Sequence, residues 1–293
     1  MSSILTNTSA ISALQTLRTI NNDMETTQDR ISSGMRVGAA KDNAAYWSIA
    51  TTMRSDNAAL SAVQDALGLG AAKVDTAYAG VTAAIDVVKE IKSKLVTATE
   101  QGVDRAKVGE EIKQLQDQLR SIGAGAAFGG ENWIAGGAAD ATIVTGFTRG
   151  SDGTVKVTTA SYDAAANSLF GDYDPATGTV ADDGLLAEVL AITLDGTTDD
   201  AAVAGFLDNV EDNLAKAQTV GSTLGSLSKR ISLQEDFASK LSDAIDKGVG
   251  RLVDADMNEE STRLKALQTQ QQLAIQSLSI ANSNSQNILS LFR

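Results

Sequence analysis

One stretch near the end of the chain has the residue types of a calcium site. Asp254, Asp256 and Asn258 alternate as the first ligands of a calcium-binding loop do. Such a loop then needs a glycine where Glu259 stands and a bidentate glutamate where Lys265 stands. We therefore interpret these residues as caps for the helix that follows, because Asp and Asn side chains accept hydrogen bonds from the free amides of a first turn.

Two other stretches share part of an enzyme motif. Ser226 and Lys229 have the Ser-x-x-Lys spacing of penicillin-binding enzymes, but they fall within a helical apolar repeat and the companion motifs are missing. The run 123–128 begins like a dinucleotide-binding fingerprint, yet it lacks the third glycine, and the chain has no P-loop. The absence of His and Cys also removes the usual neutral-pH base and all thiol chemistry. We therefore predict no enzymatic activity, no cofactor and no metal.

The last thirty residues carry the most regular pattern in the chain. Between Arg263 and Arg293 the only charge is Lys265, and the remaining surface is Gln, Ser and Asn. An uncharged polar face suits a helix enclosed by other helices, where amides can pair without the desolvation cost of ions. Steps of three and four residues place one seam on a single helical face: Leu264, Leu267, Gln271, Ala274, Leu278, Ala281, Ser285, Ile288 and Phe292.

The first residues have the same character. Residues 1–22 contain one charged side chain, Arg18, and an apolar series. The series is Ile4, Leu5, Ile11, Leu14, Leu17 and Ile20. Both chain ends are therefore predicted to be helices that supply two matching strands of a coiled coil made for assembly.

Composition and charge exclude several classes of protein. Residues 123–213 hold two basic side chains and fifteen acidic ones, so this segment carries the whole net charge of −13. An acidic surface of this kind does not bind nucleic acid. No apolar run approaches the roughly 20 residues of a membrane span, and we expect no membrane association. The N-terminus has no secretory signal peptide, so export would need another route.

The order of elements predicts a mainly α fold. Long coiled-coil-like helices from both chain ends pack together, and a small β-hairpin-rich insertion lies in the centre. We expect helices over 5–33, 43–99 and 104–122, a fourth from about 199, and a last one after the caps. Glycines are expected to end several of these helices: Gly34, Gly123, and Gly248 or Gly250, the last two as an end or a hinge. The predicted seam of the second helix is Leu60, Val63, Leu67, Gly70, Val74, Tyr78, Val81, Ile85, Val88 and Leu95.

In the central segment the helical 3–4 spacing of apolar residues gives way to β-rich runs. Residues 142–149 and 154–159 are β-rich runs that flank Gly-Ser-Asp-Gly, which predicts a hairpin, and 174–178 predicts a further turn. We therefore divide the chain into five parts. These are an N-terminal helix with its connector (1–42), long central helices (43–122), an acidic β-rich outer segment (123–198), a second long central helix (199–253) and a C-terminal helix (254–293).

Five stretches resemble bacterial flagellin. Residues 31–45 read Ile-Ser-Ser-Gly-Met-Arg-Val-Gly-Ala-Ala-Lys-Asp-Asn-Ala-Ala, which is similar to a flagellin block, and 4–7 resemble its Ile-x-Thr-Asn opening. Residues 279–282 and 288–293 resemble its C-terminal finish. Residues 45–50 read Ala-Tyr-Trp-Ser-Ile-Ala, which departs from the commoner Ala-Gly-Leu-Ala-Ile-Ala and looks like rhizobial α-proteobacterial flagellins. The resemblance covers roughly the first 120 and the last 95 residues.

The resemblance implies a secreted structural subunit of the extracellular flagellar filament. It implies a helical homopolymer, alone or with other flagellins, and contacts with the flagellar type III export apparatus, a chaperone and a cap. The terminal helices would form an inner tube through Ile4, Ile11, Leu14, Leu17, Leu264, Leu267, Leu278, Ile288 and Phe292. Gly34, Arg36, Lys41 and Asp42 would lie in the connector and make polar contacts between subunits, or form an ordinary solvated loop.

Two rival readings share these features. A hook–filament junction protein has the same terminal helices, although it should match the block at 31–45 less closely. A chemoreceptor signalling rod is also rich in Ala, Gln and Ser, but it needs a central helical hairpin where this chain has β-rich runs.

The resemblance also suggests weak recognition by an animal innate receptor. Enteric flagellins are sensed through a helix with the core Leu-Gln-Arg-Val-Arg-Glu-Leu-Ala-Val, and the matching stretch is 88–96, with Glu90, Lys92 and Lys94. Glu90 stands where that core has its first arginine, and Lys94 where it has leucine. Both changes disfavour a contact built for the enteric core. The alternative is that Glu90 and Lys94 form a solvated i, i+4 pair.

Overall fold

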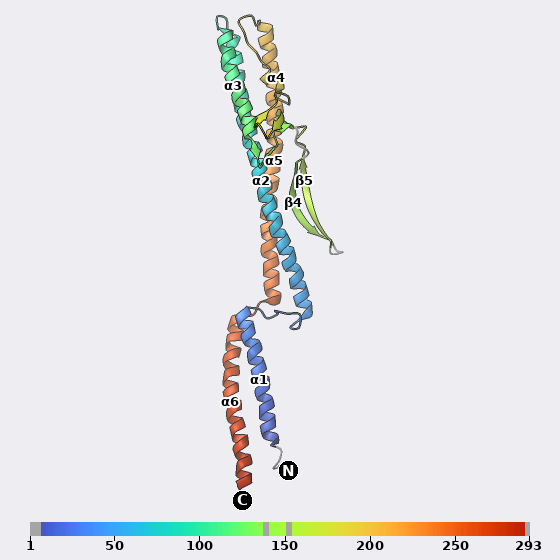
Figure 1. Cartoon of the computed structure of the whole chain (residues 1–293), viewed down its shortest axis with the longest axis vertical. Coiled ribbons are helices and arrows are strands. Elements are labelled where there is room, and N and C mark those ends of the chain that lie inside the picture. The colour runs from blue at the N-terminus through green and yellow to red at the C-terminus, as the bar shows by residue number, and fades with distance from the viewer. Residues whose placement is uncertain (1–6, 137–140, 151–153, 291–293) are drawn as a thin grey trace. The chain divides into compact units, whose positions relative to one another are not determined.

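The computed structural model describes residues 7–136, 141–150 and 154–290. The chain divides into two units (Figure 1). Unit 1 comprises residues 1–57 and 243–293, and unit 2 comprises 58–242. Each unit has a buried core of its own.

Unit 1 is built on the two terminal helices. Helix α1 (Thr8–Ser33) and helix α6 (Met257–Ser290) lie side by side along their length (Figure 1). The Asn7 side chain caps α1 by accepting a hydrogen bond from Ala10 N at 3.0 Å. The helix ends at Gly34, as predicted, because Gly34 has the left-handed conformation (φ 70°) that an L side chain rarely adopts.

One of the predicted caps of the last helix, Asp256, is confirmed. Asp256 Oδ1 accepts hydrogen bonds from Asn258 N at 2.9 Å and from Glu259 N at 3.3 Å. These bonds satisfy two of the free amides at the start of α6. Asp256 therefore begins the last helix.

A small core joins the connector to two further helices of unit 1. Helix α2 (Ala44–Ala98) and helix α5 (Asp200–Val253) each contribute one end to this unit. Val37, Ala50, Val249 and Val253 are buried together there. Helix α5 runs without interruption to Val253, so the predicted helix end at Gly248 or Gly250 is wrong, while the alternative of a hinge there stays a prediction. A Cβ at Gly248 would lie 3.0 Å from Met53 Cε, the end of a flexible side chain.

In unit 2, helices α2 and α5 and helix α3 (Arg105–Gly125) surround the main core. The buried positions of α2 follow an unbroken 3–4 repeat, but the repeat passes through Ala77 and Ala84. Tyr78, predicted to lie in the seam, is 45% exposed, and Ile85 is half-buried. Small alanines at seam positions let neighbouring helices approach closely, whereas the larger Tyr78 lies outside. The buried series is Leu60, Val63, Leu67, Gly70, Val74, Ala77, Val81, Ala84, Val88, Ile91, Leu95 and Ala98.

The predicted end of α3 at Gly123 is also wrong. The helix begins after Asp104, whose side chain accepts from Lys107 N, and continues to Gly125. Gly123 is buried, and a Cβ there would lie 2.7 Å from the Phe170 ring. This glycine therefore makes room for an aromatic side chain of the central segment.

The central segment contains the predicted hairpin. Strands β4 (Ala141–Arg149) and β5 (Val155–Tyr162) pair antiparallel, with one irregularity between Val144 and Gly146. Strand β6 (Phe170–Asp174) pairs in parallel with β3 (Ala135–Gly136) and antiparallel with β7 (Thr179–Val180). The turn predicted at 174–178 is present, and Asp174 accepts bonds from Ala176 N and the Thr177 hydroxyl. Strands β1 (Ala127–Phe128) and β2 (Glu131–Asn132) and helix α4 (Ala187–Leu190) complete the segment.

The mainly α fold with a small β-rich insertion is thus as predicted. Among the helices that the structure describes, none combines the length and the apolarity that a membrane span needs.

Candidate functional site

The seam predicted for the last helix faces α1. Leu267 is 7% exposed, and five further seam residues of α6 are half-buried. They are Leu264, Gln271, Ala274, Leu278 and Ala281. On the α1 side the buried residues are Ala10, Ile20 and Thr27. The pairing of the two chain ends therefore uses the predicted face of α6.

The face that α1 turns to α6 agrees with the predicted series at Leu17 and Ile20 but differs from it nearer the N-terminus. Ala10, Ala13, Leu17 and Ile20 follow a 3–4 repeat and are buried or half-buried. Ile11 and Leu14 are instead 56% and 41% exposed, so their predicted place in the intrachain seam is wrong. Alanine at the seam allows the two helices to approach closely, and the larger neighbours are left outside.

Polar side chains cross the pair at three levels. Asn7 Nδ2 donates to Ala281 O at 3.0 Å, and Gln271 Nε2 donates to Asn21 Oδ1 at 2.7 Å. Arg30 pairs with Glu260 Oε1 at 3.1 Å. Glu260 is 6% exposed, and its second oxygen, Oε2, has no hydrogen-bond partner within the described residues. Such directional bonds fix the register of the two helices more than they add to its stability.

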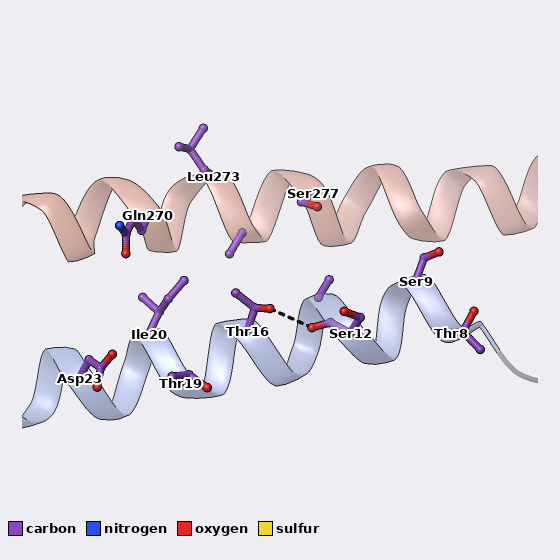
Figure 2. A pocket seen from close by; sticks show the side chains of 12 residues that line it. Thr8, Ser9, Ser12, Thr16, Thr19, Ile20, Asp23, Gln270, Leu273 and Ser277 are labelled. Carbon is purple, nitrogen blue, oxygen red and sulfur yellow. Dashed lines mark hydrogen bonds between the residues drawn. The ribbon is translucent and has the colours of Figure 1, made fainter.

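A groove of about 900 Å³ runs along one side of the pair (Figure 2). Small and hydroxyl-bearing residues dominate its walls, and Asp23 is the one charged residue among them. Thr16 and Thr19 donate to carbonyls of their own helix, at 3.1 Å and 3.2 Å, which leaves their methyl groups available. Figure 2 shows Ile20 pointing toward α6 and Leu273 pointing away from α1. The groove can therefore accept closely packed apolar groups.

Large apolar side chains are exposed around the same two helices. On α6, Leu273, Ile275 and Ile280 are 59%, 53% and 61% exposed. Sequence reasoning missed these three residues, although isoleucines on an otherwise polar helix face were a usable signal. With Ile11 and Leu14 they give the pair an apolar outer surface. Of the remaining predicted assembly residues, Ile288 lies in α6, while Ile4 and Phe292 lie outside the described residues.

The connector residues make contacts within the chain. Arg36 Nη2 donates to Leu252 O at 3.2 Å. Asp42 Oδ2 accepts from Ala39 N at 2.9 Å and from Gly38 N at 3.1 Å. The hydrogen bond from Ala39, with that from Gly38, lowers the pKa of Asp42. Lys41 is exposed. Arg36 and Asp42 thus make hydrogen bonds that shape the connector within one chain.

The stretch that resembles the receptor-binding helix lies on α2 in unit 2. Lys94 pairs with Glu111 of α3 at 2.6 Å and not with Glu90, so the suggested i, i+4 pair is wrong. The hydrogen bond to Glu111 raises the pKa of Lys94, and Glu90 adds a weaker electrostatic contribution. Lys92 forms an ion pair with Glu211 of α5. Glu90 is exposed. The three charges therefore lie on the outside of the helices, two of them bridging α2 to its neighbours.

Comparison with protein families gives two matches. Residues 4–139 match the bacterial flagellin N-terminal helical region, and residues 207–292 match the bacterial flagellin C-terminal helical region. The matched ranges contain the whole of α1, α2, α3 and α6 and most of α5.

Individual proteins are similar over the full length. The chain is 52% identical to Flagellin C and 49% identical to Flagellin A of Rhizobium meliloti (strain 1021), with 100% of each chain covered. It is 46% identical to a flagellin of Brucella melitensis biotype 1, again over 100% of both chains. A crystal structure of Bacillus cereus flagellin covers 60% of this chain and 88% of its own, with a TM-score of 0.43 and 16% identity, which is too distant to add weight.

Proposed function

Because the chain belongs to the bacterial flagellin family and so polymerises into the flagellar filament, we propose that the α1–α6 pair carries this polymerisation. The alternative of a hook–filament junction protein has no support from the matched relatives, which are flagellins. The residues proposed to bury against other copies comprise the predicted inner-helix set and three additions. They are Ile4, Ile11, Leu14, Leu17, Leu264, Leu267, Leu278, Ile288 and Phe292, joined by Leu273, Ile275 and Ile280.

The observation that carries this proposal is the exposed apolar surface of two charge-poor helices. Leu273, Ile275 and Ile280 are each more than half exposed. Full burial of an exposed Leu or Ile side chain is worth about 1.5–3 kcal/mol, so covering the exposed half of one such side chain stabilises a complex by roughly 1–1.5 kcal/mol. The neighbouring Gln, Ser and Asn side chains can pair across further helices without the cost of desolvating ions. Further copies of the chain can therefore cover the apolar side chains that a single chain leaves exposed.

The interior of one α1–α6 pair supports the same conclusion. The two helices contain 26 and 34 residues, and ordering costs about 1–2 kcal/mol per residue. The large apolar side chains buried between them are Ile20 and Leu267. We therefore propose that the pair is marginal in the monomer and is completed by assembly.

Deletion of residues 264–293 tests the proposal. We expect the truncated chain to keep the helical core of unit 2, as measured by circular dichroism, and to form no filaments in the electron microscope. Ile275→Glu should raise the critical concentration sharply, because a charge would be buried against another copy. Ile275→Leu, which keeps an apolar side chain of nearly the same volume, is the matched control and should leave the critical concentration nearly unchanged. Filaments of normal diameter from the truncated chain would contradict the proposal.

The connector and the outer segment have proposed roles in the same polymer. We propose that Gly34, Arg36, Lys41 and Asp42 hold the connector in shape and that its exposed polar groups contact neighbouring subunits. Residues 123–198, which carry most of the acidic excess, are proposed to form the outer part of the subunit. We therefore keep the proposed division of the chain into five segments, which are 1–42, 43–122, 123–198, 199–253 and 254–293.

Location and partners follow from family membership. We infer that the protein is secreted through the flagellar type III apparatus with the help of a chaperone. It then adds beneath a cap at the tip of the extracellular filament, alone or with other flagellins. We further infer that the role is structural and not catalytic, and that neither nucleic acid nor a membrane is a partner. The lack of His and Cys supports a structural role, and the net charge of −13 argues against nucleic acid as a partner.

We also propose weak recognition by the animal innate receptor. Glu90 is exposed on α2, and the Lys94 ammonium is engaged by Glu111. A receptor surface built for the enteric arginine would meet the opposite charge at Glu90. Receptor signalling by monomer is expected to be at least about tenfold weaker than by an enteric flagellin, and Glu90→Arg with Lys94→Leu should recover part of it. Equal potency of the unmodified chain would contradict this.

A further inference from the structure

We propose that Met35, in the connector, is a site of oxidation by hydrogen peroxide, and that the Arg54 guanidinium on α2 holds the sulfoxide oxygen formed there. The oxidised side chain then ties the connector to α2 more firmly than the thioether does. This site is separate from the α1–α6 pair, and its chemistry does not depend on polymerisation.

The sulfur of Met35 already accepts a hydrogen bond from a charged donor. Arg54 Nη2 donates to Met35 Sδ at 3.6 Å. The Arg54 side chain is exposed and has no ion-pair partner within the described residues. A guanidinium carries five N–H donors and a thioether is a weak acceptor, so most of the donor capacity of Arg54 is unused. A stronger acceptor at the Met35 sulfur would use that capacity.

The backbone around Met35 holds the sulfur in place beside this donor. On one side, Arg36 N donates to Val253 O at 2.7 Å. On the other side, Gly34 O accepts from Ala255 N at 2.9 Å. The Met35 side chain is half-buried and packs against the small core of unit 1. Met35 therefore keeps its position next to the guanidinium, while solvent and small oxidants still reach the pair from the exposed side.

The other methionines that the structure describes have no such donor. Met53 packs against the same small core, Met24 is half-buried on α1, and Met257 is 44% exposed. None of their sulfur atoms accepts a hydrogen bond within the described residues. An oxygen added to Met53 would stand unpaired against apolar side chains, which is costly. Met35 differs from these three because its new oxygen would meet a cation.

The reaction itself needs only the thioether and the peroxide. A lone pair on the Met35 sulfur attacks one peroxide oxygen, so that an S–O bond forms as the O–O bond breaks. The departing hydroxide takes a proton from solvent and leaves as water, with sulfur oxidised and the peroxide reduced. The sulfoxide is polar, and hydrogen bonds from an ionised donor are roughly twice as strong as those between neutral groups. Arg54 therefore binds the product better than it binds the thioether.

The stereochemistry of the product tests the role of Arg54. Oxygen can add to either lone pair of the sulfur, which gives two sulfoxide epimers that different reductases recognise. The full-length chain in solution is treated with hydrogen peroxide and digested, and each peptide is exposed to the two reductases and weighed by mass spectrometry. We expect one epimer of Met35 to exceed the other by about threefold or more, because one lone pair faces the guanidinium, and Met257 to give nearly equal amounts.

Two matched variants assign this preference to one side chain. Arg54→Leu should bring the epimer ratio of Met35 close to that of Met257. Arg263→Leu removes an exposed cation from α6 and should leave the preference unchanged. Equal epimers of Met35 in the native chain, or the same preference in Arg54→Leu, would overturn the proposal. So would a Met35 that stays reduced while Met257 is fully oxidised.

Hydrogen exchange tests the firmer tie between the connector and α2. The background is Met53→Leu, which nearly keeps the core volume and removes the competing oxidation there. After oxidation, the amides of Arg36 and Ala255 should exchange about threefold or more slowly than before it. Adding Arg54→Leu should abolish this slowing. Exchange rates that oxidation leaves unchanged or raises would overturn the tie, and neither assay requires filaments.

Discussion

The α1–α6 pair and the core of unit 2 are built on the same 3–4 repeat, but they bury different side chains. In unit 2 the repeat buries large residues completely, including Leu67, Ile91, Leu95, Leu119 and Leu224. Between α1 and α6 the corresponding positions hold Ala, Thr, Gln and a paired Glu, with Ile20 and Leu267 as the large buried residues. The spacing of the repeat is the same in both regions, but the side chains that it buries are larger in unit 2.

This difference shows that pairing and stability are set by different features of a sequence. The repeat decides which faces meet, because it places a continuous stripe along each helix. The size of the residues in the stripe decides whether two helices can offset the entropy cost of ordering. Unit 2 meets that cost with its own residues, and the terminal pair needs other copies of the chain.

The largest expected effect compares one core leucine from each region. Leu224→Ala should lower the free energy of unfolding of the monomer by about 2–5 kcal/mol, because its side chain is fully buried. Leu267→Ala should leave monomer unfolding nearly unchanged and raise the critical concentration for polymerisation. Urea denaturation followed by circular dichroism, with a sedimentation assay, measures both. Similar losses of monomer stability in the two variants would break the comparison.

Close packing in unit 2 gives the next largest effect. Gly123→Ala places a methyl group against the Phe170 ring, which a Cβ at this position would approach to 2.7 Å, and should destabilise unit 2 by about 1–3 kcal/mol. Gly205→Ala, at a helical glycine of α5 with nothing within 4 Å, is the control and should stabilise by about 0.5–1 kcal/mol. Thermal unfolding of the two variants decides the matter, and a neutral Gly123→Ala would show a loosely packed core.

The Arg30–Glu260 pair tests how α1 and α6 are held in register. Arg30→Met leaves a buried carboxylate without its partner and should lower filament stability by about 1–2 kcal/mol per subunit. The double variant with Glu260→Met should recover most of this loss, because no charge remains buried. Thermal depolymerisation compares the filaments. A double variant that recovered none of the loss relative to the native chain would mean that the ion pair itself stabilises the contact.

The smallest expected effect concerns an exposed ion pair in unit 2. The hydrogen bond from Arg120 lowers the pKa of Asp182 from its ordinary value of 3.8. A lowered folded-state pKa stabilises the fold above that ordinary value, and the contribution is lost as the pH falls through the folded-state pKa. Asp182→Asn should therefore cost at most about 1 kcal/mol at neutral pH, since the pair is largely exposed. The difference from the native chain should vanish in acid, and a difference that persisted there would point to packing instead.

The sequence predicted the helices and the α6 seam because those depend on local pattern. The apolar period of residues 264–281 is free of charges after Lys265, so one face stands out clearly. The same reasoning chose Ile11 and Leu14 over Ala10 and Ala13 on α1, and Tyr78 over Ala77 on α2. In each case the pattern was taken to place the larger side chain in the seam. Closely packed helices instead place alanine there and leave the larger neighbours outside.

Features that depend on distant parts of the chain could not be predicted. Gly123 has the composition of a helix end, but it makes room for the ring of Phe170, which lies far away in sequence. Lys94 has an acidic residue four positions before it, yet its partner is Glu111 on another helix. No local pattern reports such contacts, because they are created by the tertiary fold.

Hydrogen exchange resolved by segment, in monomer and in filament, tests most directly whether the terminal pair is completed by assembly. We predict that amides of α1 and α6 exchange rapidly in the monomer and become protected on polymerisation. The amides of α2, α3 and α5 in unit 2 should be protected in both states, because their core is complete within one chain. Equal protection of α6 in monomer and filament would show that the terminal pair is stable alone and would contradict its completion by other copies.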